Sequence, residues 1–229
     1  MRNLAIVGYG KMGRLIEQLA PQYDFTVALK LDEFNNADGE GLTAENFQGI
    51  DVAIDFSIPA AVPANVEGIA KLGVNLVVGT TGWLEHVEAV RRAVEANGIG
   101  LVWSPNFSIG VNVFFKLVAE AARLLAAEPE YGAWAWEIHH ATKKDAPSGT
   151  LLKLVEAMKK SGYGRNIDVG SSRAGTIPGT HEIGFDSAAD TITLRHTARS
   201  REGFARGALK AAQWVVGKKG FYEFSEINF

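Results

Sequence analysis

Residues 4–13 read LAIVGYGKMG, an apolar run followed by three glycines spaced G-x-G-x-x-G. The run predicts a buried strand and the residues after it predict a helix, the setting in which this glycine spacing binds a dinucleotide. Gly8 permits the tight turn, Gly10 lets the backbone approach a pyrophosphate, and Gly13 lets helix and strand pack closely. A glycine-rich turn without a ligand is the alternative interpretation.

Strand and helix patterns alternate through the first half of the chain. They predict strands at 4–7, 25–31, 51–56, 75–78 and 100–103, and helices at 14–20, 62–72 and 84–96. Strands joined through helices form a parallel sheet with helices on both faces. The apolar composition of these strands fits burial on both sides. We therefore predict an α/β fold with a Rossmann-type doubly wound parallel sheet.

The pattern changes in the second half, where fewer helices separate the strands. It predicts helices at 112–127, 150–160 and 207–216, strands at 131–140 and 191–197, and a long loop at 164–180. This order indicates a mixed α+β unit. Trp134 and Trp136 alternate on one strand and so face the same side. They belong either to a contact between subunit sheets or to a core beneath the helix at 112–127.

Composition restricts the class of protein. Of 229 residues, 47% are hydrophobic and 21% charged, as in globular domains. The net charge of −3 argues against a protein that coats nucleic acid. The absence of cysteine excludes disulfides and thiolate metal sites, and no apolar stretch approaches the ~20 residues of a membrane span. We expect a cytoplasmic protein with neither nucleic acid nor membrane as partner.

Polar and glycine residues follow several predicted strands, where ligands bind in parallel sheets. Asp32 follows the second strand and is placed to bind an adenosine ribose, and Glu33 is the neighbour that could substitute. An ordinary solvated turn acid is the alternative for either residue. Lys11 and Lys30 are cations that could meet a 2′-phosphate, which leaves both NADH and NADPH open. DFS at residues 55–57 follows the third strand and GTTG at 79–82 follows the fourth. A plain strand-to-helix turn is the alternative for GTTG, and a core role is the alternative for Phe56.

The most polar segment reads EIHHATKKDAPSGT at residues 137–150. His139 and His140 face opposite sides of a strand and so seldom share a metal, and no ligand pair follows at zinc-site spacing. A histidine near Lys143 instead indicates general acid catalysis at neutral pH. The helix start at residues 148–150 offers N–H groups to a carboxylate, and Arg201 matches a carboxylate too. A polar loop and exposed arginines are the alternative.

Together these motifs resemble the dihydrodipicolinate reductase family, also called 4-hydroxy-tetrahydrodipicolinate reductase. The matching segments are GYGKMG (8–13), IDFS (54–57), GTTG (79–82), PNFSIGVN (105–112), EIHHATKKDAPSGT (137–150), RAGTIPGTHEI (173–183) and HTARSREGFARGA (196–208). The H-H-x-x-K-x-D-A-P-S-G-T pattern is highly specific to this family, and the resemblance spans nearly the whole chain.

The resemblance implies NAD(P)H-dependent reduction of dihydrodipicolinate, formed from 4-hydroxy-tetrahydrodipicolinate, to tetrahydrodipicolinate in diaminopimelate and lysine biosynthesis. It implies a dinucleotide-binding domain at 1–107 plus 202–229, and an inserted mixed α+β substrate-binding and oligomerisation domain at 108–201. It also implies a homotetramer. Two departures from many members concern the adenosine end: a shorter glycine spacing and a shorter stretch between Asp32 and Asp51. They leave the preference between NADH and NADPH open.

The resemblance also assigns roles by motif position. His139 corresponds to the proton donor and Lys143 to its catalytic partner. The residues implied to hold the substrate carboxylates are His140, Ser148, Gly149, Thr150 and Arg201. The cofactor-binding residues expected from the motifs and the resemblance are Gly8, Gly10, Lys11, Met12, Gly13, Asp32, Phe56, Gly79, Thr81, Asn106 and Phe107. No metal is expected.

Two other classes share part of these features. An amino-acid dehydrogenase would share the glycine motif but would not need the anion site at residues 148–150. A non-catalytic sensor of dinucleotide would need neither His139 nor Lys143.

Overall fold

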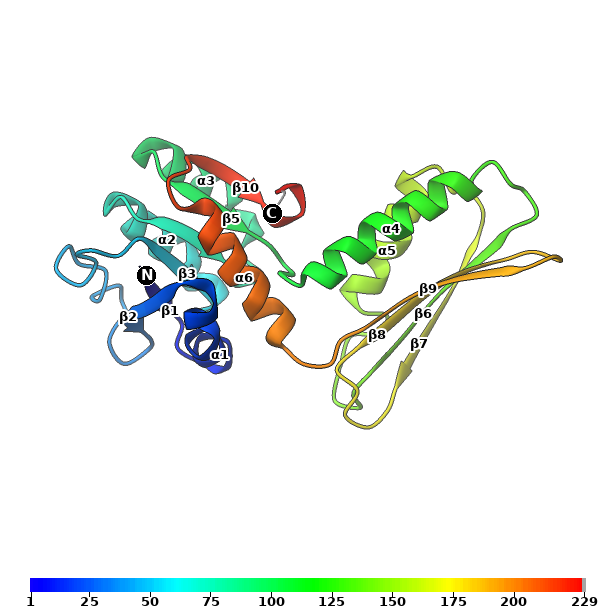
Figure 1. The fold of residues 1–229 in the computed structure, drawn as a ribbon, viewed down its shortest axis with the longest axis horizontal. Coiled ribbons are helices and arrows are strands. Elements are labelled where there is room, and N and C mark those ends of the chain that lie inside the picture. The colour runs from blue at the N-terminus through cyan, green and yellow to red at the C-terminus, as the bar shows by residue number, and fades with distance from the viewer. Residues whose placement is uncertain (228–229) are drawn as a thin grey trace. The chain divides into compact units, whose positions relative to one another are not determined.

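The computed structural model describes residues 1–227 and divides into two compact units, each with its own sheet (Figure 1). The first unit comprises Met1–Ser108 and the chain from Glu202 onward. The second unit is Ile109–Arg201. None of the helices within the described residues is long and apolar enough to cross a membrane.

The first unit contains a six-stranded sheet in the order β10-β5-β4-β3-β1-β2, and every neighbouring pair is parallel. Its strands are β1 (Arg2–Val7), β2 (Phe25–Leu31), β3 (Val52–Asp55), β4 (Asn75–Val78), β5 (Gly100–Trp103) and β10 (Gly220–Glu223). Successive residues 4–7 of β1 are all buried, because helices cover both faces of the sheet. The predicted doubly wound fold is therefore confirmed.

Two helices cover each face of this sheet (Figure 1). Helices α1 (Lys11–Leu19) and α6 (Glu202–Val215) pack together on one face. Helices α2 (Val62–Lys71) and α3 (Val87–Asn97) pack on the other, where Val66, Ile69 and Val94 meet Ala5 and Leu76 from the strands. The chain reaches α6 only after completing the second unit.

The strand order reverses between β1 and β3. From β1 the chain crosses to β2 on one side, and it then returns to β3 on the other side of β1. The connections that leave the carboxyl ends of β1 and β3 therefore run in opposite directions. Such a switch point opens a crevice above the sheet, which is the usual ligand site in doubly wound folds.

The second unit contains a mixed four-stranded sheet in the order β7-β6-β8-β9. Its elements are α4 (Ile109–Leu125), β6 (Gly132–His139), α5 (Gly149–Lys160), β7 (Ile167–Arg173), β8 (Thr180–Asp186) and β9 (Thr191–Thr197). Strand β6 pairs parallel with β7 through the α5 crossover and antiparallel with β8. The core forms where Phe114 and Val118 of α4 and Leu151 of α5 meet Ala135 and Ile183 of the sheet.

Trp134 and Trp136 lie on the sheet face opposite this core, because Ala135 between them points to the helices. The interpretation that they form a core beneath the helix at 112–127 is therefore wrong. A Cβ atom at Gly184 of β8 would overlap the Trp134 ring, and one at Gly170 of β7 would stand 3.0 Å from Trp136 Cδ1. The Trp134 ring therefore lies over Gly184 of β8, and one edge of the Trp136 ring lies near Gly170 of β7.

The predicted loop at 164–180 is also wrong, because it contains strand β7 and the first residue of β8. Strand β7 is an edge strand with one partner, and most of its residues are partly or fully exposed. Its polar IDVGSSR sequence therefore lacks the apolar alternation of a half-buried strand, and backbone pairing to β6 holds it. Helix α6 begins at Glu202, five residues before the predicted start, and both Gly203 and Gly207 lie inside it.

Candidate active site

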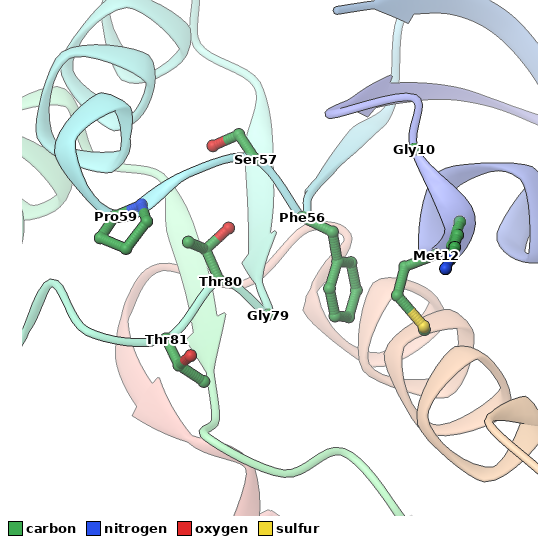
Figure 2. A pocket seen from close by; sticks show the side chains of 9 residues that line it. Gly10, Met12, Phe56, Ser57, Pro59, Gly79, Thr80 and Thr81 are labelled. Carbon is green, nitrogen blue, oxygen red and sulfur yellow. The ribbon is translucent and has the colours of Figure 1, made fainter. Parts of the chain in front are cut away.

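A cavity of about 430 Å³ lies at the carboxyl ends of β1, β3 and β4 in the first unit, beside the switch point (Figure 2). Three connecting segments line it, one after each strand. The lining residues are Gly10, Lys11, Met12, Phe56, Ser57, Pro59, Gly79, Thr80 and Thr81. Six of them were predicted to bind the cofactor: Gly10, Lys11, Met12, Phe56, Gly79 and Thr81.

The three glycines of the first motif occupy three different environments. Gly8 has φ +92°, and a Cβ atom there would overlap the Phe56 carbonyl. At Gly13 a Cβ atom would stand 2.5 Å from the Gly8 carbonyl oxygen and 3.1 Å from Ile6. A Cβ atom at Gly10 meets no described atom within 4 Å. Gly8 and Gly13 thus serve the turn and the packing, while Gly10 leaves open space at the N-terminus of α1.

Asp55 fixes two of the segments that line the cavity. Its carboxylate is fully buried and accepts hydrogen bonds from Ser57 N at 2.9 Å, Ser57 Oγ at 2.8 Å and Thr80 Oγ1 at 2.7 Å. Asn65 Nδ2 of α2 donates to the other oxygen at 2.9 Å. Burial raises the pKa of Asp55, and these hydrogen bonds oppose that rise. One side chain therefore ties the ends of β3 and β4 to α2.

Phe56 forms the middle of the cavity wall. Its ring stands between Met12 and Gly79 in Figure 2, so close to Gly79 that a Cβ atom there would overlap it. Behind it lies Phe107, with ring centroids 6.4 Å apart. Phe107 is 2% exposed and packs on Phe224, so it supports the wall rather than lining the cavity. Asn106 lies just before it, in the segment that follows β5.

The residues predicted to meet the adenosine part of the cofactor include Asp32, which directly follows the end of β2. Asp32 Oδ1 accepts a hydrogen bond from Phe34 N at 2.9 Å, which closes a tight turn. Lys30 Nζ lies 3.0 Å from Glu17 Oε1, and Tyr9 OH also donates to Glu17. The charge of Lys30 is therefore paired with Glu17 of α1. Lys11 is exposed and lines the cavity.

A second cluster of functional side chains lies at the end of β6 in the second unit. Glu137 is fully buried, and its Oε1 accepts hydrogen bonds from Ser148 N at 2.8 Å, Ser171 Oγ at 2.8 Å and Arg173 at 2.9 Å. Its Oε2 accepts from Ser148 Oγ. The same oxygen lies 3.6 Å from His139 Nδ1 and 3.3 Å from His181 Nε2.

The electrostatics of this cluster follow from burial and hydrogen bonding. Burial alone would raise the pKa of Glu137, but hydrogen bonds from Ser148, Ser171 and Arg173 outweigh it and lower the pKa to about 2. Burial lowers the pKa of His181 to about 4, with a further contribution from His139. Burial also lowers the pKa of His139, which the Glu137 carboxylate opposes. Glu137 is therefore ionised and His181 neutral at pH 7.

Three atoms of this cluster could in principle bind a metal. Glu137, His139 and His181 each offer one ligand-type atom, and these lie within 4.8 Å of one another. The Arg173 guanidinium already binds the same carboxylate, however, and its positive charge opposes a cation there.

The predicted catalytic and substrate residues follow β6 along the chain. His139 is 8% exposed and ends β6, while Lys143 lies in the next loop with its Nζ 2.6 Å from Asp145 Oδ1. His140 Nδ1 is 2.7 Å from Thr142 Oγ1. Arg201 is exposed and is the last residue of the second unit.

Ser148 is the N-cap of α5, and Gly149 and Thr150 are its first two residues. The Ser148 hydroxyl accepts from Leu151 N at 3.2 Å and donates to Glu137, and the Ser148 N–H also binds Glu137. Ser148 is 3% exposed, whereas Gly149 is exposed and Thr150 partly exposed. The structure thus commits Ser148 to shaping the helix start.

Several residues of both clusters had no predicted role. In the cavity these are Ser57, Pro59, Thr80 and the supporting Asp55; in the second unit they are Glu137, Arg173 and His181. Glu137 precedes His139 by two positions, a spacing that places both on one face of a strand. This spacing in the sequence could have linked Glu137 to His139. Arg173 and His181, by contrast, reach the cluster only through the pairing of β6 with β7 and β8.

Comparisons with known proteins place both halves of the chain in one family. The family model described as "Dihydrodipicolinate reductase, N-terminus" matches residues 2–107, and the one described as "Dihydrodipicolinate reductase, C-terminus" matches residues 110–227. A protein of Christiangramia forsetii named 4-hydroxy-tetrahydrodipicolinate reductase is 36% identical, covering 98% of this chain and 97% of that protein.

Two further relatives agree. A Methanosarcina mazei protein of the same name is 35% identical over 99% of both chains. A dihydrodipicolinate reductase of Paenisporosarcina sp. TG-14, solved with dipicolinate bound, has the same fold with a TM-score of 0.83 at 24% identity over the full length of both chains. The chain belongs to the dihydrodipicolinate reductase family of oxidoreductases.

Proposed function

We propose that this protein uses NADH or NADPH to reduce dihydrodipicolinate, formed from 4-hydroxy-tetrahydrodipicolinate, to tetrahydrodipicolinate in diaminopimelate and lysine biosynthesis. The observation that carries the proposal is the arrangement after β6. A buried histidine, a lysine and the exposed start of a helix follow one another on one short segment, His139 to Thr150. Such a segment offers a proton donor, a positive charge and an anion site to one small acidic substrate.

The first unit supplies the cofactor site of this proposal. Its cavity lies at the switch point of a parallel sheet, where dinucleotides bind in this fold. The open space at Gly10 gives a pyrophosphate close access to the N–H groups that begin α1. Phe56, Gly79 and Thr81 would contact the nicotinamide, and Asp32 would bind the ribose of the adenosine. Reduced nicotinamide, when bound, supplies the hydride that reduces C4 of the substrate ring.

The second unit supplies the side chains that bind the substrate and protonate it. His139 donates the proton that completes the reduction, and Lys143 stabilises the negative charge that develops on the ring. The substrate carboxylates are held by His140, Arg201 and the start of α5. Because the N–H and hydroxyl of Ser148 bind Glu137, Gly149 and Thr150 make the direct contacts there and Ser148 sets their geometry.

In this proposal residues 1–107 plus 202–229 bind the dinucleotide and residues 108–201 bind substrate, and the division of the chain after Ser108 and before Glu202 supports it. The second domain also assembles the homotetramer. Trp134 and Trp136 support this, because they lie on the sheet face opposite the core that α4 and α5 cover. Tryptophan is enriched where protein surfaces associate.

One assay separates this proposal from its rivals. Purified protein is given NADH or NADPH together with freshly made dihydrodipicolinate, and cofactor oxidation is followed. We expect oxidation that depends on dihydrodipicolinate. Oxidation only with a 2-oxo acid and ammonia would instead assign an amino-acid dehydrogenase. Cofactor binding without oxidation by any substrate would assign a dinucleotide sensor.

A further inference from the structure

Glu137 is a carboxylate whose two oxygens have different surroundings. Oε1 is held by three donors from three segments: Ser148 N at the start of α5, and Ser171 Oγ and Arg173 of β7. Oε2 accepts one hydrogen bond, from Ser148 Oγ, and also faces two imidazole nitrogens. Three donors on one oxygen fasten the carboxylate, so the other oxygen has a fixed position relative to His139.

His139 has a buried nitrogen that lacks a partner. Nδ1 makes no hydrogen bond within the described part of the chain, and Glu137 Oε2 lies 3.6 Å away. That separation is too long for a hydrogen bond. Hydrogen bonds in catalytic sites often shorten only when the substrate is bound. A carboxylate at Nδ1 would fix the tautomer of the ring and stabilise the imidazolium, which leaves Nε2 to carry the proton that is transferred.

Two neighbouring residues flank the His139 ring. Its centroid lies 5.1 Å from that of His181 in an edge-to-face arrangement. On another side lies Gly179, where a Cβ atom would stand 2.8 Å from Nε2. A side chain at position 179 would therefore crowd Nε2, and glycine there leaves room for the ring.

The charged groups around His139 differ in sign. Lys143 of the following loop and Arg173 of β7 disfavour its protonated form, as burial does. Asp145 favours protonation but is more than half exposed. His181 of β8, itself close to His196 of β9, is neutral at pH 7. Glu137 is thus the one buried anion that favours a proton on His139 among the groups that face it.

We infer, on the basis of the proposed function, that Glu137 is a positioning residue for the reduction: it keeps His139 oriented and favours its protonated form as donor, and it holds the first turn of α5 for the substrate carboxylate. Both N–H and hydroxyl of Ser148 bind this one side chain. The same carboxylate therefore places the proton donor and the anion site relative to each other.

Glu137→Gln tests the inference because it removes the charge and keeps the size of the side chain. We expect kcat to fall at least about tenfold at neutral pH. As pH rises, kcat should begin to decline at a lower pH than in the wild type. We expect the pKa of His139, followed by NMR of ¹⁵N-labelled histidine, to fall by about 1–3. Affinity for NADH, measured by fluorescence, should stay the same because the cofactor cavity lies in the first unit.

Ser171→Ala is the matched control, since it removes one donor to Glu137 and leaves the charge facing His139. We expect its pH profile and His139 pKa to shift much less than those of Glu137→Gln, because two other donors still hold Oε1. Hydrogen exchange at residues 149–152 should speed up in Glu137→Gln and much less in Ser171→Ala. An unchanged His139 pKa and pH profile in Glu137→Gln, with lower stability alone, would overturn the inference.

A third variant covers the case in which Glu137→Gln fails to fold. Glu137→Asp keeps the charge but withdraws it from His139 by one methylene, so the His139 pKa should fall by less. Equal pKa values in Glu137→Asp and the wild type, with kcat reduced, would also overturn the inference. Because the NMR titration needs no turnover, it tests Glu137 even where the wild-type protein proves inactive on dihydrodipicolinate.

Discussion

Gly13 and Gly8 approach so closely that a Cβ atom at position 13 would stand 2.5 Å from the Gly8 carbonyl oxygen. Real Cβ atoms do not come this near, so α1 can pack on β1 only with glycine at this position. At Gly10, three residues earlier, a Cβ atom meets nothing within 4 Å among the described residues. One motif therefore contains a position that serves packing and a position that leaves space beside the helix start.

Gly13→Ala and Gly10→Ala should consequently differ in what they damage. We expect Gly13→Ala to lower the midpoint of thermal unfolding, because backbone atoms of the turn must move. Gly10→Ala should leave that midpoint nearly unchanged and weaken NADH binding at least about tenfold, because its methyl group would occupy the space proposed for the pyrophosphate. Unfolding followed by circular dichroism and NADH titration by fluorescence measure the two effects. NADH affinity unaffected by Gly10→Ala would place the pyrophosphate elsewhere.

The residues around the cavity were largely predictable because one rule places them. In a parallel sheet the segments after the strands meet at one edge, so Gly10, Phe56 and Gly79 come together whatever the details of packing. Asp55 received no role, since a buried acid that fastens two loops has the same sequence pattern as a turn acid. Its partners Asn65 and Thr80 come from other segments, and only the folded chain shows them.

The second cluster depended on information that sequence patterns do not contain. In the pairing register, Glu137 lies opposite His181 of β8, and His139 lies opposite Arg173 of β7. Shifting either register by one residue would move these side chains to the other face of the sheet. Strand β7 itself was predicted as loop, because an exposed edge strand is held by backbone hydrogen bonds and needs few apolar side chains.

Asp32 should influence which cofactor is preferred. Its carboxylate closes the turn after β2 by accepting from Phe34 N, and it would repel a 2′-phosphate while binding ribose hydroxyls. We expect NADH and NADPH both to bind, and Asp32→Ala to weaken NADH more than NADPH. Asp32→Asn is the better-matched variant, because an amide oxygen can keep the bond to Phe34. Equal losses for both cofactors in titrations would assign Asp32 to the turn alone.

Assembly should depend on the sheet face that bears Trp134 and Trp136. We expect the wild-type protein to sediment as a tetramer at micromolar concentration, and Trp136→Glu to dissociate it, because a charge would replace a flat apolar contact. Leu124→Glu on α4 is the control, since Leu124 is 57% exposed and lies on a helix that packs on the opposite face of the same sheet. A wild-type monomer under these conditions would refute the tetramer.

His181 should make the second unit less stable in mild acid. Its pKa is lowered to about 4 in the folded protein, chiefly by burial, whereas the unfolded chain takes up the proton near 6.5. Between these values the unfolded state binds more protons, so the free energy of unfolding falls as pH falls. We expect a loss of about 2 kcal/mol between pH 8 and pH 5.

Hydrogen exchange of β6 and β8 amides at several pH values measures this loss. His181→Gln has no proton to take up in the same range, so its slope should be shallower than that of the wild type. His139 and His196 also have lowered pKa values and contribute in the same direction, which leaves some slope in the variant. Identical slopes in both proteins would assign the acid sensitivity to other groups.

His139 and Lys143 should affect the chemical step more than binding. Groups that act on the transition state lower kcat when removed, whereas groups that bind substrate and transition state alike raise KM. We expect His139→Gln and Lys143→Ala each to lower kcat by ~10²–10⁴-fold with NADH affinity unchanged. Arg201→Ala and Thr150→Val should mainly raise KM.

The double variant of His139 and Lys143 should lose less kcat than the product of the two single losses, because the pair acts as a unit. A His139→Gln enzyme with nearly full kcat would exclude His139 as the proton donor and make Lys143 or a bound water the better candidate.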